Sequence, residues 1–298
     1  MEIRRIAVIG SGQMGTGMAQ VTARAGLETV LMKMTPGNIE AGKQKIAKAL
    51  QRDVEKQRCT QEELDATLGR LTCTSKVDDL AKCDLIIESV IEDLDEKKRL
   101  FASLEGVVGE NAIFASNTST LSITALAEAT KRPTRVIGLH FFNPAPVMKL
   151  VEIVPTLRTD PEVLKAAQEF TAKVKKTGVT IRDFTGFVVN RLLTPYMVDA
   201  MRTVQEGLAS IGAIDSAMQL GANHPMGPLA LADFIGLDIV FHMSNNLYDE
   251  YKEPRFTPPP ILKRLVMAGY LGRKSGRGFY DYATTPPTPN DFLVSSVA

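Results

Sequence analysis

The sequence predicts an α/β protein with a mostly parallel sheet in its N-terminal part and a smaller all-helical C-terminal domain. Two observations carry this prediction. Through the first half of the 298 residues, short apolar runs rich in β-branched residues alternate with amphipathic or charged stretches, which is the pattern of strands joined by covering helices. From Phe187 to about Tyr251 the apolar residues recur at helical spacing instead.

Each predicted element follows from such a run. The predicted strands are Ile6–Ile9, Val30–Met32, Leu85–Val90, Ile113–Ala115, Val136–Leu139 and Val151–Val154. Helices are expected over Thr16–Ala25, Gly42–Lys56, Asp93–Val108 and Ile261–Ala268. The change of pattern near Gly186 divides the chain into a first domain of residues 1–185, a helical domain of residues 186–284 and a tail of residues 285–298 that is expected to lie outside the core.

Composition and charge exclude several classes of protein. Lys plus Arg (35) nearly balances Asp plus Glu (34), so nothing favours nucleic acid or a membrane surface as a partner. The sequence has no apolar run of about 18 residues, the length that a membrane-spanning helix needs. The three cysteines form no Cys-x-x-Cys pair, which argues against a disulfide framework and a metal site and favours a reducing, cytoplasmic location.

A glycine loop is the strongest local signal. Gly10-Ser11-Gly12-Gln13-Met14-Gly15 follows the first predicted strand and opens a helix. The first glycine permits a tight turn, the second lets a pyrophosphate approach the backbone, and the third lets the helix pack against the strand. The free N–H groups of the helix N-terminus then face the phosphates. The segment predicts a Rossmann-type domain that binds NAD or NADP.

One position departs from that pattern. The second strand of such a domain ordinarily ends with an acid that accepts hydrogen bonds from the adenosine ribose, and Lys33 stands there instead. A lysine cannot accept those hydrogen bonds, but it can pair with a phosphate. Lys33 therefore indicates either a preference for NADP or a side chain that points to solvent while NAD binds through other contacts.

Three further segments narrow the prediction to one family. They are Phe114-Ala115-Ser116-Asn117-Thr118-Ser119, Gly138-Leu139-His140-Phe141-Phe142-Asn143-Pro144 and Gly186-Phe187-Val188-Val189-Asn190-Arg191. With the glycine loop and His224-Pro225-Met226-Gly227-Pro228, they closely resemble the 3-hydroxyacyl-CoA dehydrogenase family, including its bacterial 3-hydroxybutyryl-CoA dehydrogenases. The resemblance covers residues 1 to about 282, and it implies that the helical domain forms a homodimer.

His140 and Glu152 are the predicted acid–base pair. His140 ends a predicted strand, where ligands bind in α/β sheets. If that strand and the next fold back antiparallel, Phe142 faces Leu150 and His140 lies beside Glu152. A carboxylate in that place fixes the imidazole tautomer and stabilises its protonated form, and the resemblance implies the same roles. The alternative is a buried histidine bonded to a backbone carbonyl, with Glu152 on the surface.

Ser119 and Asn190 complete the catalytic set that the resemblance implies. From the residues alone, the hydroxyls of Ser116–Thr120 are more simply explained as a helix N-cap, and Asn190 as an ordinary polar position on a helix. The resemblance selects Ser119 and Asn190 as hydrogen-bond partners of the substrate oxygens, contributed by both domains. Asn117 is expected to shape the cofactor pocket.

The resemblance also assigns Glu92 and Lys97 to the nicotinamide ribose side of the cofactor. Their alternatives are a favourable acid at a helix N-terminus and an ordinary surface lysine. The positions expected to bind cofactor are Gly10, Gly12, Gln13, Met14, Gly15, Lys33, Glu92, Lys97, Asn117, Ser119 and Asn143.

A basic stretch is the candidate site for the substrate's phosphates. Residues 42–58 hold six lysines and arginines, diluted by Asp53 and Glu55, so a solvated helix face is the default interpretation. The resemblance matches Lys56 to a lysine that contacts coenzyme A, while a neighbouring polar contact of the family falls on Ala49 here.

The predicted reaction is reversible, NAD(P)-dependent oxidation of a 3-hydroxyacyl-CoA to the 3-ketoacyl-CoA, as in fatty acid β-oxidation. A close alternative is a dehydrogenase that acts on the same acyl group bound to an acyl-carrier protein, because an acidic carrier would meet the same basic helix. A free β-hydroxy acid dehydrogenase would use a lysine base in place of the His140–Glu152 pair. A non-catalytic, crystallin-like NAD-binding protein is the alternative from another class.

Overall fold

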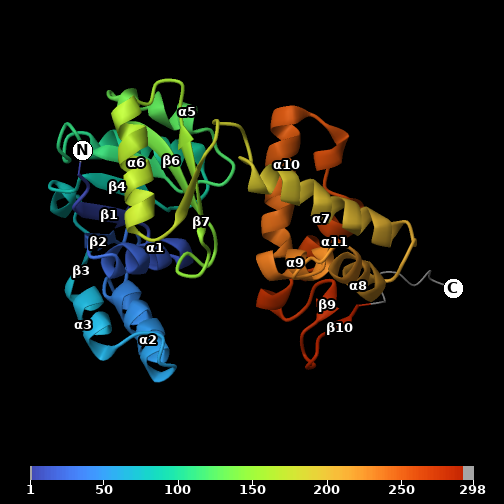
Figure 1. Cartoon of the computed structure of the whole chain (residues 1–298). Coiled ribbons are helices and arrows are strands. Elements are labelled where there is room, and N and C mark those ends of the chain that lie inside the picture. The colour runs from blue at the N-terminus through green and yellow to red at the C-terminus, as the bar shows by residue number, and fades with distance from the viewer. Residues whose placement is uncertain (1, 291–298) are drawn as a thin grey trace. The chain divides into compact units, whose positions relative to one another are not determined.

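The computed structural model describes residues 2–290. The chain divides into two compact units, Met1–Phe184 and Thr185–Ala298, which are shown in Figure 1. The first unit holds an eight-stranded sheet with the strand order β3-β2-β1-β4-β5-β6-β7-β8. Its strands are β1 (Arg5–Ile9), β2 (Glu28–Met32), β3 (Leu71–Thr74), β4 (Leu85–Glu88), β5 (Ile113–Ser116), β6 (Val136–Phe141), β7 (Leu150–Pro155) and β8 (Thr177–Thr180).

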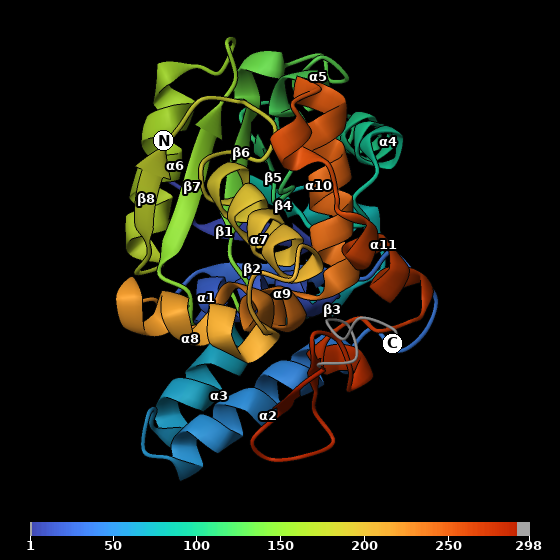
Figure 2. The ribbon, with the colours of Figure 1, turned by 90° about the vertical axis from the view of Figure 1, so that its right-hand side faces the viewer.

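The sheet is mostly parallel, as the sequence predicts. Strands β3, β2, β1, β4, β5 and β6 pair in parallel. The chain then reverses, so that β7 pairs antiparallel to β6 and parallel to β8. Figure 2 shows β6, β7 and β8 side by side. Every residue of β4, β5 and β6 is buried, which is why these strands read as continuous apolar runs rather than alternating ones.

The helices of the first unit are α1 (Gln13–Arg24), α2 (Ala41–Glu55), α3 (Gln61–Gly69), α4 (Leu94–Leu104), α5 (Ile123–Ala127) and α6 (Pro161–Lys173). They pack on this sheet or, as α2 and α3 mainly do, on one another and on α1 (Figures 1 and 2). Residues of α1 pack with those of β1, β2 and β4 in one apolar core, which includes Met18, Ile6, Leu31 and Ile87.

Several elements of the first unit differ from the sequence-based expectation. Helix α1 begins within the glycine motif rather than at Thr16, and β4 ends at Glu88 rather than Val90. Helices α3 and α6 and strands β3 and β8 were not expected. All four residues of strand β8, at the sheet edge, are exposed, and one of them is a glycine, so the strand lacks the apolar pattern on which a strand prediction rests.

The second unit is built from helices. They are α7 (Val189–Gln205), α8 (Ile211–Gly221), α9 (Pro228–Ile235), α10 (Leu237–Tyr251) and α11 (Pro260–Met267). Their apolar faces form a core of their own, which includes Met197, Leu229, Val240 and Leu262. None of the helices within residues 2–290 is long and apolar enough to cross a membrane.

The expected tail from residue 285 is wrong for residues 288–290. Strand β10 (Thr288–Pro289) pairs antiparallel with β9 (Tyr280–Asp281). Asn290 is 7% exposed, because its backbone N–H donates to the carbonyl of Phe279 and its amide donates to the carbonyl of Gly278. Residues 288–290 are therefore held by polar contacts that an apolar pattern does not reveal. The rest of the predicted tail, residues 291–298, lies outside the described residues.

Candidate active site

The glycine loop lies where the strand order of the sheet reverses, between β1 and β4. Gly10 has a φ of 109°, and a Cβ there would lie 2.2 Å from the carbonyl oxygen of Ser89, directly after β4. A Cβ on Gly15 would lie 1.8 Å from the carbonyl oxygen of Gly10. Neither position can hold a larger residue. In sheets of this kind the point of reversal, at the carboxyl ends of the strands, is where dinucleotides bind.

The start of α1 suits a pyrophosphate. Gly12 is the N-cap residue, and the first turn carries neither a capping side chain nor an acid, so its N–H groups remain available to an anion. A Cβ on Gly12 would meet nothing within 4 Å. Because Gly12 has no side chain, the space beside the helix N-terminus is open. A bound dinucleotide requires such a space for its pyrophosphate.

Lys33 directly follows β2 and is half-buried. Its Nζ donates a hydrogen bond to Oγ1 of Thr35 at 2.5 Å. The ammonium group is therefore held at the end of β2 rather than extended away from the chain. This is the position at which an acid ordinarily contacts the adenosine ribose, and the local charge there is positive.

His140 and Glu152 face each other on the antiparallel strands β6 and β7. The Nδ1 atom of His140 lies 2.7 Å from Oε2 of Glu152. The side chains are 7% and 1% exposed. Because a carboxylate only accepts hydrogen bonds, Nδ1 is the donor, and in the neutral ring Nε2 then carries the lone pair. The ring of Phe142 lies against that of His140, with 4.4 Å between centroids. The alternative of a surface Glu152 is wrong.

Ser119 lies in the loop that follows β5. Its backbone N–H donates to Oε1 of Glu92 at 3.0 Å, and its hydroxyl lies 3.4 Å from the same oxygen. The helix-cap alternative fails for Ser119, because the N-cap of α5 is Ser122, whose hydroxyl accepts from the N–H of Ala125. Asn117, in the same loop, contacts strand β6, because its Oδ1 accepts a hydrogen bond from the N–H of Phe141 at 2.8 Å.

Lys97 is not a surface lysine. It is 1% exposed, and its Nζ lies 3.3 Å from Oε2 of Glu92 and bonds both carboxylate oxygens of buried Glu88. Burial raises the pKa of Glu88 well above its ordinary value, against the opposing effect of Lys97. For Glu92, burial acts in the same direction, but the charge of Lys97 and the hydrogen bonds from Thr118 and Ser119 outweigh it and hold the pKa of Glu92 below its ordinary value.

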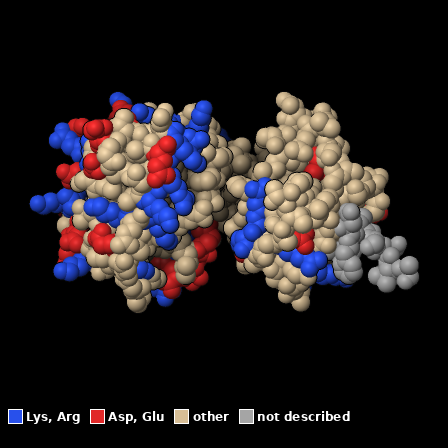
Figure 3. All heavy atoms as spheres, turned by 90° about the horizontal axis from the view of Figure 1, so that it is seen from below, with Lys and Arg blue, Asp and Glu red and all other residues tan. Residues whose placement is uncertain are grey.

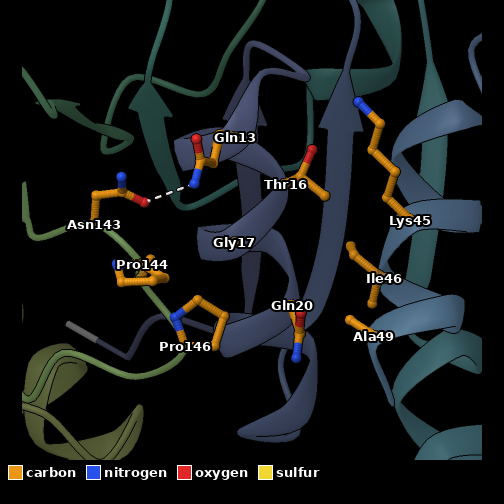
Figure 4. Close-up of a pocket in the computed structure, with 11 residues that line it drawn as sticks. Gln13, Thr16, Gly17, Gln20, Lys45, Ile46, Ala49, Asn143, Pro144 and Pro146 are labelled. Carbon is orange, nitrogen blue, oxygen red and sulfur yellow. Dashed lines mark hydrogen bonds between the residues drawn. The ribbon is translucent and has the colours of Figure 1, made fainter. Parts of the chain in front are cut away.

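A groove of about 300 Å³ runs between α1, α2 and the loop from β6 to β7. Figure 4 shows its lining residues, which are Gln13, Thr16, Gly17, Gln20, Lys45, Ile46, Ala49, Asn143, Pro144, Ala145 and Pro146. At one end the amide of Gln13 donates to Oδ1 of Asn143 at 3.0 Å. Two positions predicted to bind cofactor thus join the glycine loop to the loop that follows His140.

The predicted substrate lysine, Lys56, is exposed at the C-cap of α2 and does not line this groove. The basic residue that lines it is Lys45, one turn before Ala49. Lys45, Ala49 and Lys56 are separated by four and seven residues, so they share one helix face. That spacing was present in the sequence and could have identified Lys45.

Asn190, the remaining predicted catalytic residue, belongs to the second unit and lies in the first turn of α7. Within residues 2–290, no three His, Cys, Asp or Glu side chains gather in a way that could hold a metal ion. On the face shown in Figure 3, basic and acidic side chains are interspersed over the first unit.

Both units of the chain match known protein families. Residues 5–184 match the family described as 3-hydroxyacyl-CoA dehydrogenase, NAD binding domain, and residues 186–282 match its C-terminal domain. The chain is 47% identical to a 3-hydroxybutyryl-CoA dehydrogenase of Mycobacterium tuberculosis, over 94% of this chain and 99% of that protein. It is 40% identical to the mitochondrial hydroxyacyl-coenzyme A dehydrogenase of Sus scrofa, over 94% and 91%.

Among solved structures, the chain is similar to (S)-3-hydroxybutyryl-CoA dehydrogenase PaaH1 from Ralstonia eutropha. The TM-score is 0.91 and the identity 42%, with 95% of this chain and 100% of that chain covered.

Proposed function

The chain belongs to the 3-hydroxyacyl-CoA dehydrogenase family, and from this premise we propose that it interconverts a 3-hydroxyacyl-CoA and the 3-ketoacyl-CoA, with His140 as the acid–base residue. The observation that carries the proposal is the buried contact between His140 and Glu152 at the ligand-binding edge of the sheet. It is a histidine held in one tautomer by a carboxylate, which is the arrangement that a proton-transferring group requires.

The roles of the chain's own residues follow from this arrangement. Nε2 of His140 accepts the proton of the 3-hydroxyl group, and Glu152 stabilises the imidazolium that forms. Ser119 and Asn190 donate hydrogen bonds to the substrate oxygens, which favours the developing keto form. When bound, the nicotinamide supplies the acceptor for the hydride that leaves C3. In the reverse direction His140 returns the proton to the keto oxygen.

The identity of the carrier is tested with paired substrates. The same 3-hydroxybutyryl group is offered as the thioester of coenzyme A and of an acyl-carrier protein, with kcat/KM measured for each. We expect the coenzyme A thioester to be the better substrate. A higher kcat/KM for the carrier thioester would replace coenzyme A with the carrier protein in the proposal.

The choice between NAD and NADP is tested at Lys33. We propose that NAD binds and that Lys33 lets NADP bind as well, because a lysine can pair with the additional phosphate. Lys33→Asp is expected to lower the ratio of kcat/KM for NADP to that for NAD by about 10- to 100-fold, the value of one charge-assisted hydrogen bond. Lys131→Asp makes the same charge change at an exposed loop residue and is the control. An unchanged ratio in Lys33→Asp would mean that Lys33 takes no part in cofactor selection.

The basic face of α2 is proposed to receive the phosphates of coenzyme A, with Lys56 among its contacts. Lys56→Glu is expected to raise the KM for acetoacetyl-CoA about two- to fivefold and to leave the KM for cofactor nearly unchanged. The effect is modest because Lys56 is exposed and surface charge pairs contribute about 1 kcal/mol or less. Lys82→Glu, at another exposed lysine, is the matched control. Equal increases in both KM values for Lys56→Glu would contradict a specific role.

We further propose that the protein forms a homodimer through its second unit. We also propose that it is cytoplasmic and acts in fatty acid β-oxidation. The dimer is supported by large apolar side chains that the helices of that unit expose, among them Leu192, Leu220 and Met267, which are 68%, 88% and 78% exposed. The location is supported by three free cysteines, which suit a reducing compartment.

A further inference from the structure

Glu88 is a fully buried carboxylate that the proposed mechanism does not use. It ends β4, at the edge of the sheet where the glycine loop lies. Oε2 of Glu88 accepts a hydrogen bond from Nζ of Lys97 at 2.8 Å, and Oε1 bonds the same nitrogen. The hydroxyl of Ser116 lies 3.4 Å from Oε1. Because both charged groups are out of water, the pair is screened little by solvent and fixes the position of the ammonium group.

The ammonium group of Lys97 also contacts Glu92. Nζ of Lys97 lies 3.3 Å from Oε2 of Glu92. The other oxygen of Glu92, Oε1, accepts from the hydroxyl of Thr118 at 2.5 Å and from the N–H of Ser119 at 3.0 Å. The N–H of Thr120 lies 3.4 Å from the same oxygen. Three successive contacts, Glu88 to Lys97, Lys97 to Glu92 and Glu92 to the N–H of Ser119, thus connect the end of β4 to the loop that carries Ser119.

The charges make this connection depend on Glu88. An ionised carboxylate is a stronger acceptor for the loop N–H groups than a protonated one, and the charge of Lys97 favours the ionised form of Glu92. Lys97 is shared between two carboxylates, so neither is fully neutralised by it. If Glu88 lost its charge, Lys97 would keep Glu92 as its anionic partner, and its ammonium group would no longer be held at the end of β4. Lys97 and Glu92 would then shift together, and the loop that is bonded to Glu92 would shift with them.

We propose that Glu88 is a positioning residue: it anchors Lys97, through which Glu92 holds Ser119 in the geometry that the reaction needs. This inference rests on the proposed function, because it assigns Glu88 to the step in which Ser119 contacts substrate. It adds a buried residue, which acts through Lys97 and Glu92, to the residues that determine turnover.

The test is a double-mutant cycle between Glu88 and Ser119. Glu88→Gln keeps the shape of the side chain and removes its charge, while Lys97 retains Glu92 as an anionic partner. In acetoacetyl-CoA reduction, Glu88→Gln alone is expected to lower kcat about tenfold, with a smaller change in the KM for acetoacetyl-CoA. In the Ser119→Ala background the same substitution is expected to lower kcat by less than about twofold, because coupled residues are non-additive.

The control is Glu105→Gln, at the opposite end of α4 from Lys97, where Glu105 is the C-cap residue and lies near Arg132. It disturbs the same helix and is expected to leave kcat within about twofold of wild type. If Glu88→Gln does not fold, the cycle is run with Glu88→Asp, which keeps the charge and shortens its reach by one methylene. Equal losses of kcat in the two Ser119 backgrounds, with either substitution, would overturn the inference. An inactive wild-type enzyme would instead overturn the proposed function, so the two failures are distinct.

Discussion

Replacement of His140 by glutamine is expected to lower turnover of acetoacetyl-CoA by about 10²- to 10⁴-fold, the usual contribution of a positioned acid–base group. Glutamine keeps the polarity and approximate size of the side chain, but it cannot exchange a proton near neutral pH. Binding of NADH should persist, because the glycine loop and the N-terminus of α1 are untouched. The measurements are kcat in the reductive direction and a titration of NADH fluorescence, which the absence of tryptophan from the chain makes simple.

Glu152→Gln is the companion variant. It keeps an oxygen near Nδ1 of His140 but removes the charge that stabilises the imidazolium. Its loss of turnover should be smaller than that of His140→Gln, and the double variant should be no slower than His140→Gln alone, because the two residues act as one unit. Turnover of His140→Gln close to that of wild type would end the assignment of His140 as the acid–base residue.

Replacement of Lys97 by methionine is expected to destabilise the first unit by about 3–5 kcal/mol at pH 9, because it leaves the carboxylate of Glu88 buried without its cation. Both side chains are almost fully buried, at 1% and 0% exposed, so solvent cannot compensate. The free energy of unfolding is measured with urea for the wild type and the variant. Removing both charges in Lys97→Met/Glu88→Gln should restore much of the loss, because no unpaired buried charge then remains.

The Lys97→Met variant should also depend on pH in a defined direction. Burial raises the pKa of Glu88 above its ordinary value of 4.5, and loss of Lys97 raises it further. A group whose pKa is raised in the folded state stabilises that state below its ordinary pKa, and the stabilisation is lost as the pH rises through the raised value. Wild type and variant both lose this stabilisation between pH 4.5 and about 7, the raised pKa of Glu88 in the wild type. The deficit of Lys97→Met should therefore be small up to about pH 7 and grow above it, where Glu88 is ionised in the wild type but still binds its proton in the variant. A deficit that does not grow between pH 7 and pH 9 would contradict the buried pair as its cause.

The strands of the sheet and the glycine loop could be predicted because their signals are local. A buried parallel strand needs a continuous apolar run, and the run before Gly10 has no other simple explanation. The contact between His140 and Glu152 could also be predicted, because a reversal between two neighbouring strands fixes which residues face each other. Opposed pairs on β6 and β7 keep a constant sum of residue numbers, so the expected Phe142–Leu150 register places 140 opposite 152.

The edges of the sheet could not be predicted in the same way. Strands β3 and β8 are four residues long and hold few buried apolar groups, so pairing with a neighbour, rather than their own sequence, defines them. Helix α3, in contrast, has a local signal in the sequence. Thr60 and Glu63 form a capping box in which each side chain accepts from the backbone of the other.

The burial of Lys97 could not be predicted from the sequence for a different reason. A lysine on an amphipathic helix is usually exposed, and nothing in its neighbours in sequence indicates that Glu88 lies beneath it. Its partners come from the end of β4 and the turn before α4, so the ion pair exists only once the strand and helix have packed. The groove between α1 and α2 differs in this respect, because the helical spacing of Lys45, Ala49 and Lys56 in the sequence could have identified Lys45 as its lining lysine.

The central claim is a nicotinamide-dependent reaction of a 3-ketoacyl-CoA with His140 as the proton donor. Its most direct test is the oxidation of NADH and of NADPH, in parallel, by wild-type protein and by His140→Gln with acetoacetyl-CoA. The account predicts turnover by the wild type with at least one of the two cofactors and a loss of about 10²- to 10⁴-fold in the variant. Turnover that is equal in the two proteins, or absent from the wild type with both cofactors and with bulkier or carrier-bound acyl groups, would contradict it.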